Sequence, residues 1–228
     1  MSEEKLTRAA IVTGGSRGIG RAVCVALAKQ GCNVVVNYCH GAEPAEQTAA
    51  LCRAEGVQAV TVQADVSTAE GCKALFDAAA EAFGRVDVLV NNAGITRDNL
   101  ILRLTEQDFD AVLDTNLKSA FLCCKEAARR MVRQRYGRIV NLSSVVALRG
   151  NAGQSLFHKT AQGLAGADFQ NVVHTQLAQR NAYAHAALQD GNGQSLFAEG
   201  QHSSFSAAMR CLPLFHRSSR MSATGRTS

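Results

Sequence analysis

The stretch TGGSRGIG, Thr13 to Gly20, decides the fold of this 228-residue chain. It follows the apolar run AAIV and opens the helical pattern GIGRAVCVALAK, so it is predicted to turn a strand into a helix. Its glycines at 14, 18 and 20 permit a tight turn and a close approach to the backbone. The first N–H groups of a helix have no partner within it and can bind a phosphate. In this context the motif predicts a dinucleotide site rather than an ordinary loop.

The same alternation of strand and helix continues to about residue 144. β-branched runs such as NVVVNY, AVTVQADV and VDVLVNNAG are separated by longer helical patterns, of which residues 105–137 form the longest. Glycines at 31, 56, 84 and 137 stand where each helix should stop before the next strand. Such an alternation favours a parallel sheet with helices on both faces. We therefore predict a Rossmann-type, doubly wound α/β/α domain of three layers over residues 5–166.

The character of the sequence changes after about Gln154. Residues 155–228 contain no Ile and only two Val, at 172 and 173, which is too little β-branched material for further buried strands. Residues 167–228 are therefore predicted to be an aberrant, partly disordered tail. A reading-frame slip near Gln154 would remove every later signal at once. We favour it over a divergent but functional tail, because a protein that has lost only its catalysis usually keeps its core.

Composition argues against several classes of function. The net charge of +5 is spread among acidic residues, so nucleic acid is not an expected partner. The start MSEEKLTRAAIVTGG carries charges where a signal peptide would be apolar, and no window approaches the ~20 apolar residues of a membrane span, so a cytoplasmic protein without membrane association is expected. The eight cysteines lack CxxC spacing and are expected to be reduced thiols, and the histidines are scattered without ligand spacing, so no metal site is predicted.

The choice between the two nicotinamide dinucleotides depends on the end of the second predicted strand. An acidic residue there would bind a ribose 2′-hydroxyl and repel a 2′-phosphate, but this strand ends VVVNYCHG, with Asn37 and no carboxylate. Arg17, inside the glycine turn, could pair with the phosphate. NADP(H) is therefore the predicted cofactor. The alternative is that Arg17 merely points into solvent.

Two further motifs follow predicted strands. Asp65 and Val66 follow one strand, and Asn92, Ala93 and Gly94 end another. Because the carboxyl ends of parallel strands meet at one edge, these residues are expected to line the same crevice. Asp65 could accept a hydrogen bond from an adenine amino group or cap the next helix, and Asn92 could be a structural turn residue. The predicted cofactor-binding residues are Gly14, Ser16, Arg17, Gly18, Ile19, Gly20, Asn37, Asp65, Val66, Asn92, Ala93 and Gly94.

These motifs, together with Asn116 in TNLKSAF and Ser144 in NLSSVVALRGNAGQ, resemble the short-chain dehydrogenase/reductases in order and spacing. The phrases NNAGITRDNL and GRIVNLSSVVALRGNAGQ are most similar to bacterial 3-oxoacyl-[acyl-carrier-protein] reductases. The resemblance covers about residues 7–166. It implies hydride transfer from NADPH to a 3-ketone, with a tyrosine as proton donor, a lysine four residues later, a serine that polarises the carbonyl and an asparagine that supports a water relay. Ser144 and Asn116 match the last two.

The tyrosine and lysine positions are the main departure from the family. They fall on Phe157 and Ala161, which offer neither a proton donor nor a cation. His158 and Lys159 are offset on the predicted helix and should point elsewhere. Tyr183, the only later tyrosine, has no lysine four residues on.

The resemblance therefore implies an NADPH-dependent 3-oxoacyl-thioester reductase whose activity is impaired in this chain. The alternatives are a non-catalytic NADP-binding pseudoenzyme, or a short-chain dehydrogenase with another carbonyl or alcohol substrate. The family's substrate is a small molecule carried on an acidic acyl carrier protein. Either a contact with that protein or a merely solvated face would account for Arg129, Arg130, Arg133 and Arg135. The homo-oligomeric assembly of the family is in doubt here, because the later strands are not recognisable.

Overall fold

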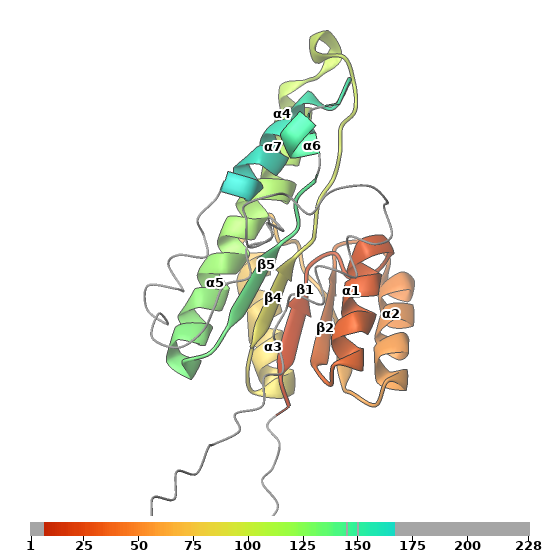
Figure 1. The fold of residues 1–228 in the computed structure, drawn as a ribbon, viewed down its shortest axis with the longest axis vertical. Helices are drawn as coiled ribbons and strands as arrows, with labels where there is room; N and C mark the ends of the chain where they lie inside the picture. Colours follow the sequence, from red (N-terminus) through yellow and green to blue (C-terminus); the bar gives the residue numbers. More distant parts are fainter. Residues whose placement is uncertain (1–6, 145, 150, 167–228) are drawn as a thin grey trace, which may run out of the picture.

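The computed structural model describes residues 7–144, 146–149 and 151–166. The predicted tail, with Tyr183, lies outside the described residues. Within them, five strands form one parallel sheet in the order β3-β2-β1-β4-β5 (Figure 1). The strands are β1 (Ala9–Val12), β2 (Asn33–Tyr38), β3 (Ala59–Gln63), β4 (Val88–Asn91) and β5 (Arg138–Asn141).

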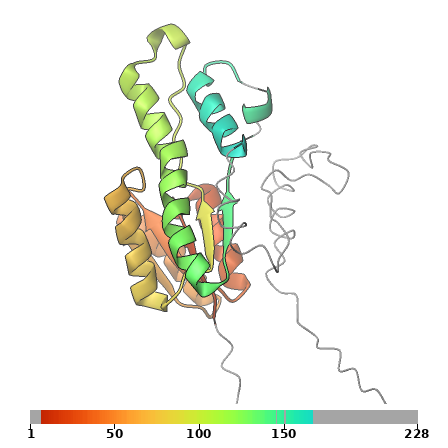
Figure 2. The ribbon, with the colours of Figure 1, turned by 90° about the vertical axis from the view of Figure 1, so that its left-hand side faces the viewer.

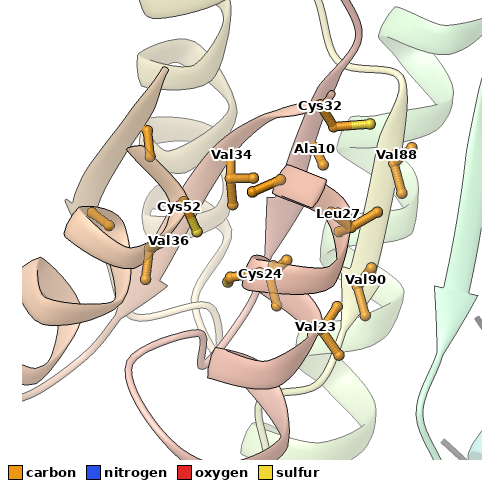
Figure 3. Packing of buried hydrophobic residues seen from close by; sticks show 14 of the residues in the cluster. Ala10, Val23, Cys24, Leu27, Cys32, Val34, Val36, Cys52, Val88 and Val90 are labelled. Carbon is orange, nitrogen blue, oxygen red and sulfur yellow. The ribbon is translucent and has the colours of Figure 1, made fainter. Parts of the chain in front are cut away.

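Helices cover both faces of this sheet, as the sequence predicts. On one face α1 (Gly18–Lys29) and α2 (Ala42–Ala54) pack on alternate strand residues, and Figure 3 shows the cluster that includes Val34, Val36, Val88 and Val90. On the other face α3 (Ala69–Phe83) and α5 (Ser119–Gln134) cover the residues in between, among them Ile11, Val35 and Leu89. Because successive side chains of a strand point to opposite faces of the sheet, the apolar strands contribute to two separate cores.

Short helices stand beyond the carboxyl edge of the sheet. They are η1 (Ile101–Arg103), α4 (Glu106–Leu113), the π-helical turn η2 (Asp114–Lys118), α6 (Val146–Arg149) and α7 (Ser155–Gly166). A reciprocal capping box of Thr105 and Asp108 begins α4. Helix α7 packs against α4, α6 and η2, and these elements rise together above β4 and β5 (Figure 1). They form the wall that faces the ends of the strands.

The doubly wound parallel sheet is confirmed, and so is the long helical segment predicted over residues 105–137. It runs without a gap from Glu106 to Gln134 as α4, the π-helical turn η2 and α5, and only its predicted end differs from the structure. Gly31, Gly56 and Gly84 follow their helices with positive φ angles, as predicted, but α5 ends at Gln134 and the residue after it, Arg135, has a φ of 55°. Gly137 is needed for another reason. A Cβ there would lie 2.3 Å from the sulfur of Met131.

Within the described ranges, none of the helices combines the length and the apolar character that a membrane crossing requires.

Candidate functional site

The strand order reverses between β1 and β4. β1 pairs with β2 on one side and with β4 on the other, so the first three strands extend one way and the next two the other. The connections that leave β1 and β4 therefore run to opposite sides, and this topology places a crevice at the carboxyl ends of the two strands. In open α/β sheets this is where ligands bind.

The glycine turn after β1 is built for a close approach. Gly14 and Gly18 have φ angles of +62° and +55°. A Cβ on Gly20 would lie 2.2 Å from the carbonyl oxygen of Gly14, so only glycine fits there. No side chain caps the start of α1, and its first turn holds no acidic residue. The turn therefore offers free N–H groups and a positive helix end to an anion, which fits the pyrophosphate of a dinucleotide.

The side chains of this turn divide into two groups. Arg17 and Ile19 are exposed, with 62% of Ile19 accessible, so they face a prospective ligand or solvent. Ser16 is half-buried, and its carbonyl oxygen accepts hydrogen bonds from Arg21 and from Thr48 of α2. These bonds fix the turn against the next helix and leave Arg17 free of that structural task.

Asn92 joins the end of β4 to the glycine turn. Its Nδ2 donates to the carbonyl oxygens of Thr13, at 2.8 Å, and Gly14, at 3.0 Å. In return the Thr13 hydroxyl accepts from the backbone N–H groups of Asn92 and Ala93, both at 3.0 Å. The side chain of Asn92 thus has the structural role that the sequence left open.

Asn37 lies at the end of β2, but its side chain is directed into the protein. The residue is only 2% exposed; its Oδ1 accepts from the N–H of Gly14 and its Nδ2 donates to the carbonyl oxygen of Ala64. The side chains that emerge beyond it are the exposed Cys39 and His40. Strand β2 ends without a carboxylate that would bind a ribose 2′-hydroxyl, as the sequence indicated. The side chain of Asn37 itself supports the glycine turn.

Asp65 follows β3 and is exposed at the same edge. Its Oδ1 accepts from the backbone N–H and the hydroxyl of Ser67, and these bonds lower the pKa of the Asp65 carboxyl. The cap of α3 is Thr68, whose Oγ1 accepts from the N–H of Gly71, so Asp65 does not cap that helix itself. Val66 is buried, and its carbonyl oxygen accepts from the thiol of Cys72.

Asn116 occupies the π-helical turn and is 3% exposed. Its Oδ1 accepts from the N–H of Ile95 at 2.7 Å, and its Nδ2 donates to the carbonyl oxygen of Ile95 at 2.9 Å and to the hydroxyl of Thr160 at 3.3 Å. A Cβ on Gly94 would lie 3.3 Å from Oδ1. Asn116 therefore connects the end of β4 to α7.

Ser144 lies after β5, beside the start of α6. Its hydroxyl accepts from the N–H of Val146 at 3.2 Å. The preceding Ser143 donates to the carbonyl oxygen of Ala161 at 2.8 Å, which docks α7 on the end of β5. Ala161 is 2% exposed and Phe157 is half-buried one turn earlier. The predicted serine, tyrosine and lysine positions thus belong to one wall, although two of them carry apolar side chains.

The two residues considered as substitutes are engaged elsewhere. The Nδ1 of His158 is hydrogen-bonded to the carbonyl oxygen of Val146, and the exposed Lys159 donates to Gln162 on its own helix. Sequence reasoning missed Ser143, Thr160 and Thr13 as supports of the site. For Thr13 the TGG motif itself was a usable signal, whereas the partners of the other two depend on how α7 packs.

The described cysteines match the expectation of free, mostly buried thiols. Cys39 is exposed, and the other six are buried, at positions 24, 32, 52, 72, 123 and 124. Residues 7–144, 146–149 and 151–166 contain no group of three or more His, Cys, Asp or Glu side chains that could hold a metal ion.

Comparison with known proteins agrees with this geometry. Residues 8–188 match the short chain dehydrogenase family. This chain is a member of that family. Membership of this family supports a nicotinamide cofactor.

Several short-chain dehydrogenases are similar to the chain. The 3-oxoacyl-[acyl-carrier-protein] reductase of Staphylococcus aureus (strain Mu50) is 49% identical over 71% of this chain and 66% of its own length. The protein of the same name from Synechocystis is 44% identical over 78% of this chain and 71% of its own. The crystal structure of a short-chain alcohol dehydrogenase from Sinorhizobium meliloti has a TM-score of 0.67 and 39% identity, covering 70% of this chain and 63% of that one. The chain spans just under two thirds, 66%, of the Staphylococcus reductase.

Proposed function

We propose that the crevice binds NADP(H), and that the chain is a 3-oxoacyl-thioester reductase by descent whose rate of carbonyl reduction is close to background. The observation that carries the proposal is the docking of α7. Its bonds from Ser143 to Ala161 and from Asn116 to Thr160 hold the helix against the site while Phe157 and Ala161 stand in the positions of the family's tyrosine and lysine.

The proposed binding of NADP(H) is supported by the glycine turn and by the positive charge of Arg17. The uncapped start of α1 offers N–H groups to the pyrophosphate. The exposed guanidinium of Arg17 beside this turn suits a 2′-phosphate, and no carboxylate at the end of β2 opposes it. Asp65, at the end of β3, keeps an ionised carboxyl that can accept from the adenine amino group.

The proposed loss of turnover follows from the missing proton donor. A bound nicotinamide would supply the hydride, and the protein must then protonate the substrate oxygen. The hydroxyl of Ser144 can donate to a carbonyl oxygen and polarise it. Phe157 has no O–H, and Ala161 has no cation to hold a ribose or lower a neighbouring pKa. A positioned general acid contributes roughly 10²- to 10⁴-fold, so its loss leaves little turnover.

The proposed 3-oxoacyl-thioester substrate rests on resemblance to the acyl-carrier-protein reductases. An acidic carrier would need free cations on the surface. Arg129 and Arg130 are paired with Glu126, and Arg130 also with Asp77, so they are less suited to this contact than they looked in the sequence. Arg133 and Arg135, both exposed near the end of α5, are the better candidates.

The test measures binding and turnover on the same full-length protein. NADPH is titrated by its fluorescence, and oxidation of NADPH is then followed with acetoacetyl thioester. We expect saturable binding without turnover. Phe157→Tyr combined with Ala161→Lys is not expected to restore the rate, because the sequence after residue 166 lacks the family's later strand signals. Full recovery in that variant would show that the rest of the site is competent.

A further inference from the structure

Two buried thiols meet between neighbouring helices on one face of the sheet. Cys72 lies in the first turn of α3 and Cys123 near the start of α5, and Figure 2 shows these helices side by side. Their sulfur atoms are 3.5 Å apart, although the residues are 51 positions apart in the sequence. Both residues are 0% exposed. A disulfide needs a sulfur–sulfur distance of about 2.05 Å, so the two sulfur atoms must approach each other by roughly 1.5 Å to form a bond.

The hydrogen bonds at this contact have a direction. The thiol of Cys72 donates to the carbonyl oxygen of Val66 at 3.1 Å, so the thiol of Cys123 is the group that donates to the sulfur of Cys72. This donation lowers the pKa of Cys72, although burial opposes it, and the same bond raises the pKa of Cys123. The Cys72 sulfur thus accepts the hydrogen bond that favours its thiolate, and Cys123 is the neighbour placed to react with it.

We propose that Cys72 and Cys123 form an oxidisable dithiol that a peroxide converts into a disulfide joining α3 to α5. The Cys72 thiolate attacks one peroxide oxygen and the O–O bond breaks, so that Cys72 becomes a sulfenic acid. The departing hydroxide or alkoxide takes the proton that Cys72 released and leaves as water or an alcohol. The Cys123 sulfur then attacks the Cys72 sulfur, the S–O bond breaks, and the departing hydroxide takes the Cys123 proton as water. For hydrogen peroxide, two thiols lose two electrons in total and the peroxide becomes two waters.

The other buried cysteines of the described residues lack this arrangement. Cys24, Cys32 and Cys52 belong to the core on the opposite face of the sheet (Figure 3), where burial raises the pKa of Cys52 to about 11. Cys124 is next to Cys123 in sequence, but its sulfur accepts from Asn91 at 3.3 Å and burial raises its pKa to about 12. Among the buried cysteines that the structure describes, disulfide formation with peroxide should therefore be selective for this one pair.

The disulfide would change a hydrogen bond next to the candidate cofactor site. It removes the thiol hydrogen that Cys72 donates to Val66, directly after Asp65 at the carboxyl edge of the sheet. It also closes a long loop between two core helices, which disfavours the unfolded chain and should raise the melting temperature.

The experiment treats the folded full-length chain with hydrogen peroxide, blocks remaining thiols with N-ethylmaleimide under denaturing conditions, and digests it with trypsin. The tryptic peptide 54–73 contains only Cys72, and the peptide 119–125 contains Cys123 and Cys124. We expect these two peptides to be linked, with a loss of two hydrogens, and the link to disappear on reduction. The unmodified protein suffices for this step, so the result does not depend on a variant that folds.

The matched variants are Cys124→Ser, which should keep the link, and Cys123→Ser, which should lose it. Fragmentation of the linked peptides from the unmodified chain assigns the bonded sulfur independently if either variant fails to fold. A parallel reaction in urea should give a mixture of links. The proposal is wrong if folded protein keeps both thiols free while the exposed Cys39 is oxidised, if the link uses Cys124, or if the folded and urea reactions give the same mixture.

Discussion

Asn92 holds the glycine turn through a pair of hydrogen bonds, with its Nδ2 at 2.8 Å from the carbonyl oxygen of Thr13 and 3.0 Å from that of Gly14. The strand end β4 and the strand end β1 are thereby fixed relative to each other across the crevice. The cofactor site therefore depends on Asn92 as a support of the glycine turn, and not only on residues that would touch the cofactor.

Replacing Asn92 should therefore weaken both stability and binding. Asn92→Ala leaves two carbonyl oxygens without their donor, and we expect a loss of about 1–3 kcal/mol in the free energy of unfolding together with weaker NADPH binding. Urea denaturation and NADPH titration measure the two effects. Asn151→Ala, at an exposed position, is the control and should change neither. Unaltered stability and affinity in Asn92→Ala would contradict the assigned role.

Gly20 is predicted to tolerate no side chain. In Gly20→Ala the new Cβ would lie 2.2 Å from the Gly14 carbonyl oxygen, so the turn must move away from its binding geometry. We expect at least a tenfold rise in the dissociation constant of NADPH, which corresponds to about 1.4 kcal/mol. Ala22→Ser, on the exposed side of α1, serves as the matched change in the same helix. Equal affinities in the two variants would rule out the close-approach argument.

Arg17 should determine the preference for NADPH over NADH. If its guanidinium pairs with the 2′-phosphate, Arg17→Ala weakens NADPH binding by about 10- to 100-fold, the range for a hydrogen bond to a charged group, and leaves NADH unaffected. Both cofactors are titrated against the same preparation, with Arg103→Ala as an exposed arginine control. An equal loss for both cofactors would assign Arg17 to the pyrophosphate instead, and no loss would place it in solvent.

Asp65 should make stability depend on acid pH. Its pKa lies below the ordinary value of 3.8 because the carboxylate accepts from Ser67. A group with a depressed folded-state pKa stabilises the protein above its unfolded-state pKa and loses that contribution as the pH falls through the folded-state pKa. Asp65→Asn should flatten the decline of unfolding free energy below about pH 4. The exposed Asp110→Asn is the control, and identical acid profiles for the two variants would contradict the prediction.

The fold could be predicted from sequence because its signals are local. Strand β2 has the predicted bounds, and glycines 31, 56 and 84 end their helices in the left-handed conformation. The π-helical turn inside the long helix was not predictable in this way, since Asp114–Lys118 contains neither Gly nor Pro and the turn fits the site around Asn116.

The candidate site could be predicted by position but not by side-chain direction. Strand ends placed Asn37, Asp65 and Asn92 at one edge, as the parallel topology requires. Whether an amide there faces a ligand or the backbone depends on the neighbouring loop, and Asn37 turned inward to Gly14 and Ala64. The supports of α7 come from packing between segments far apart in sequence, which no local pattern encodes.

The most direct test of the account is the rate of NADPH oxidation by the full-length chain at saturating NADPH and acetoacetyl thioester, measured on protein shown by titration to bind NADPH. The account predicts saturable NADPH binding with turnover indistinguishable from the rate without protein, because Phe157 and Ala161 replace the proton donor and the cation. Turnover at an ordinary enzymatic rate, on the order of 1 to 10³ per second, would contradict it.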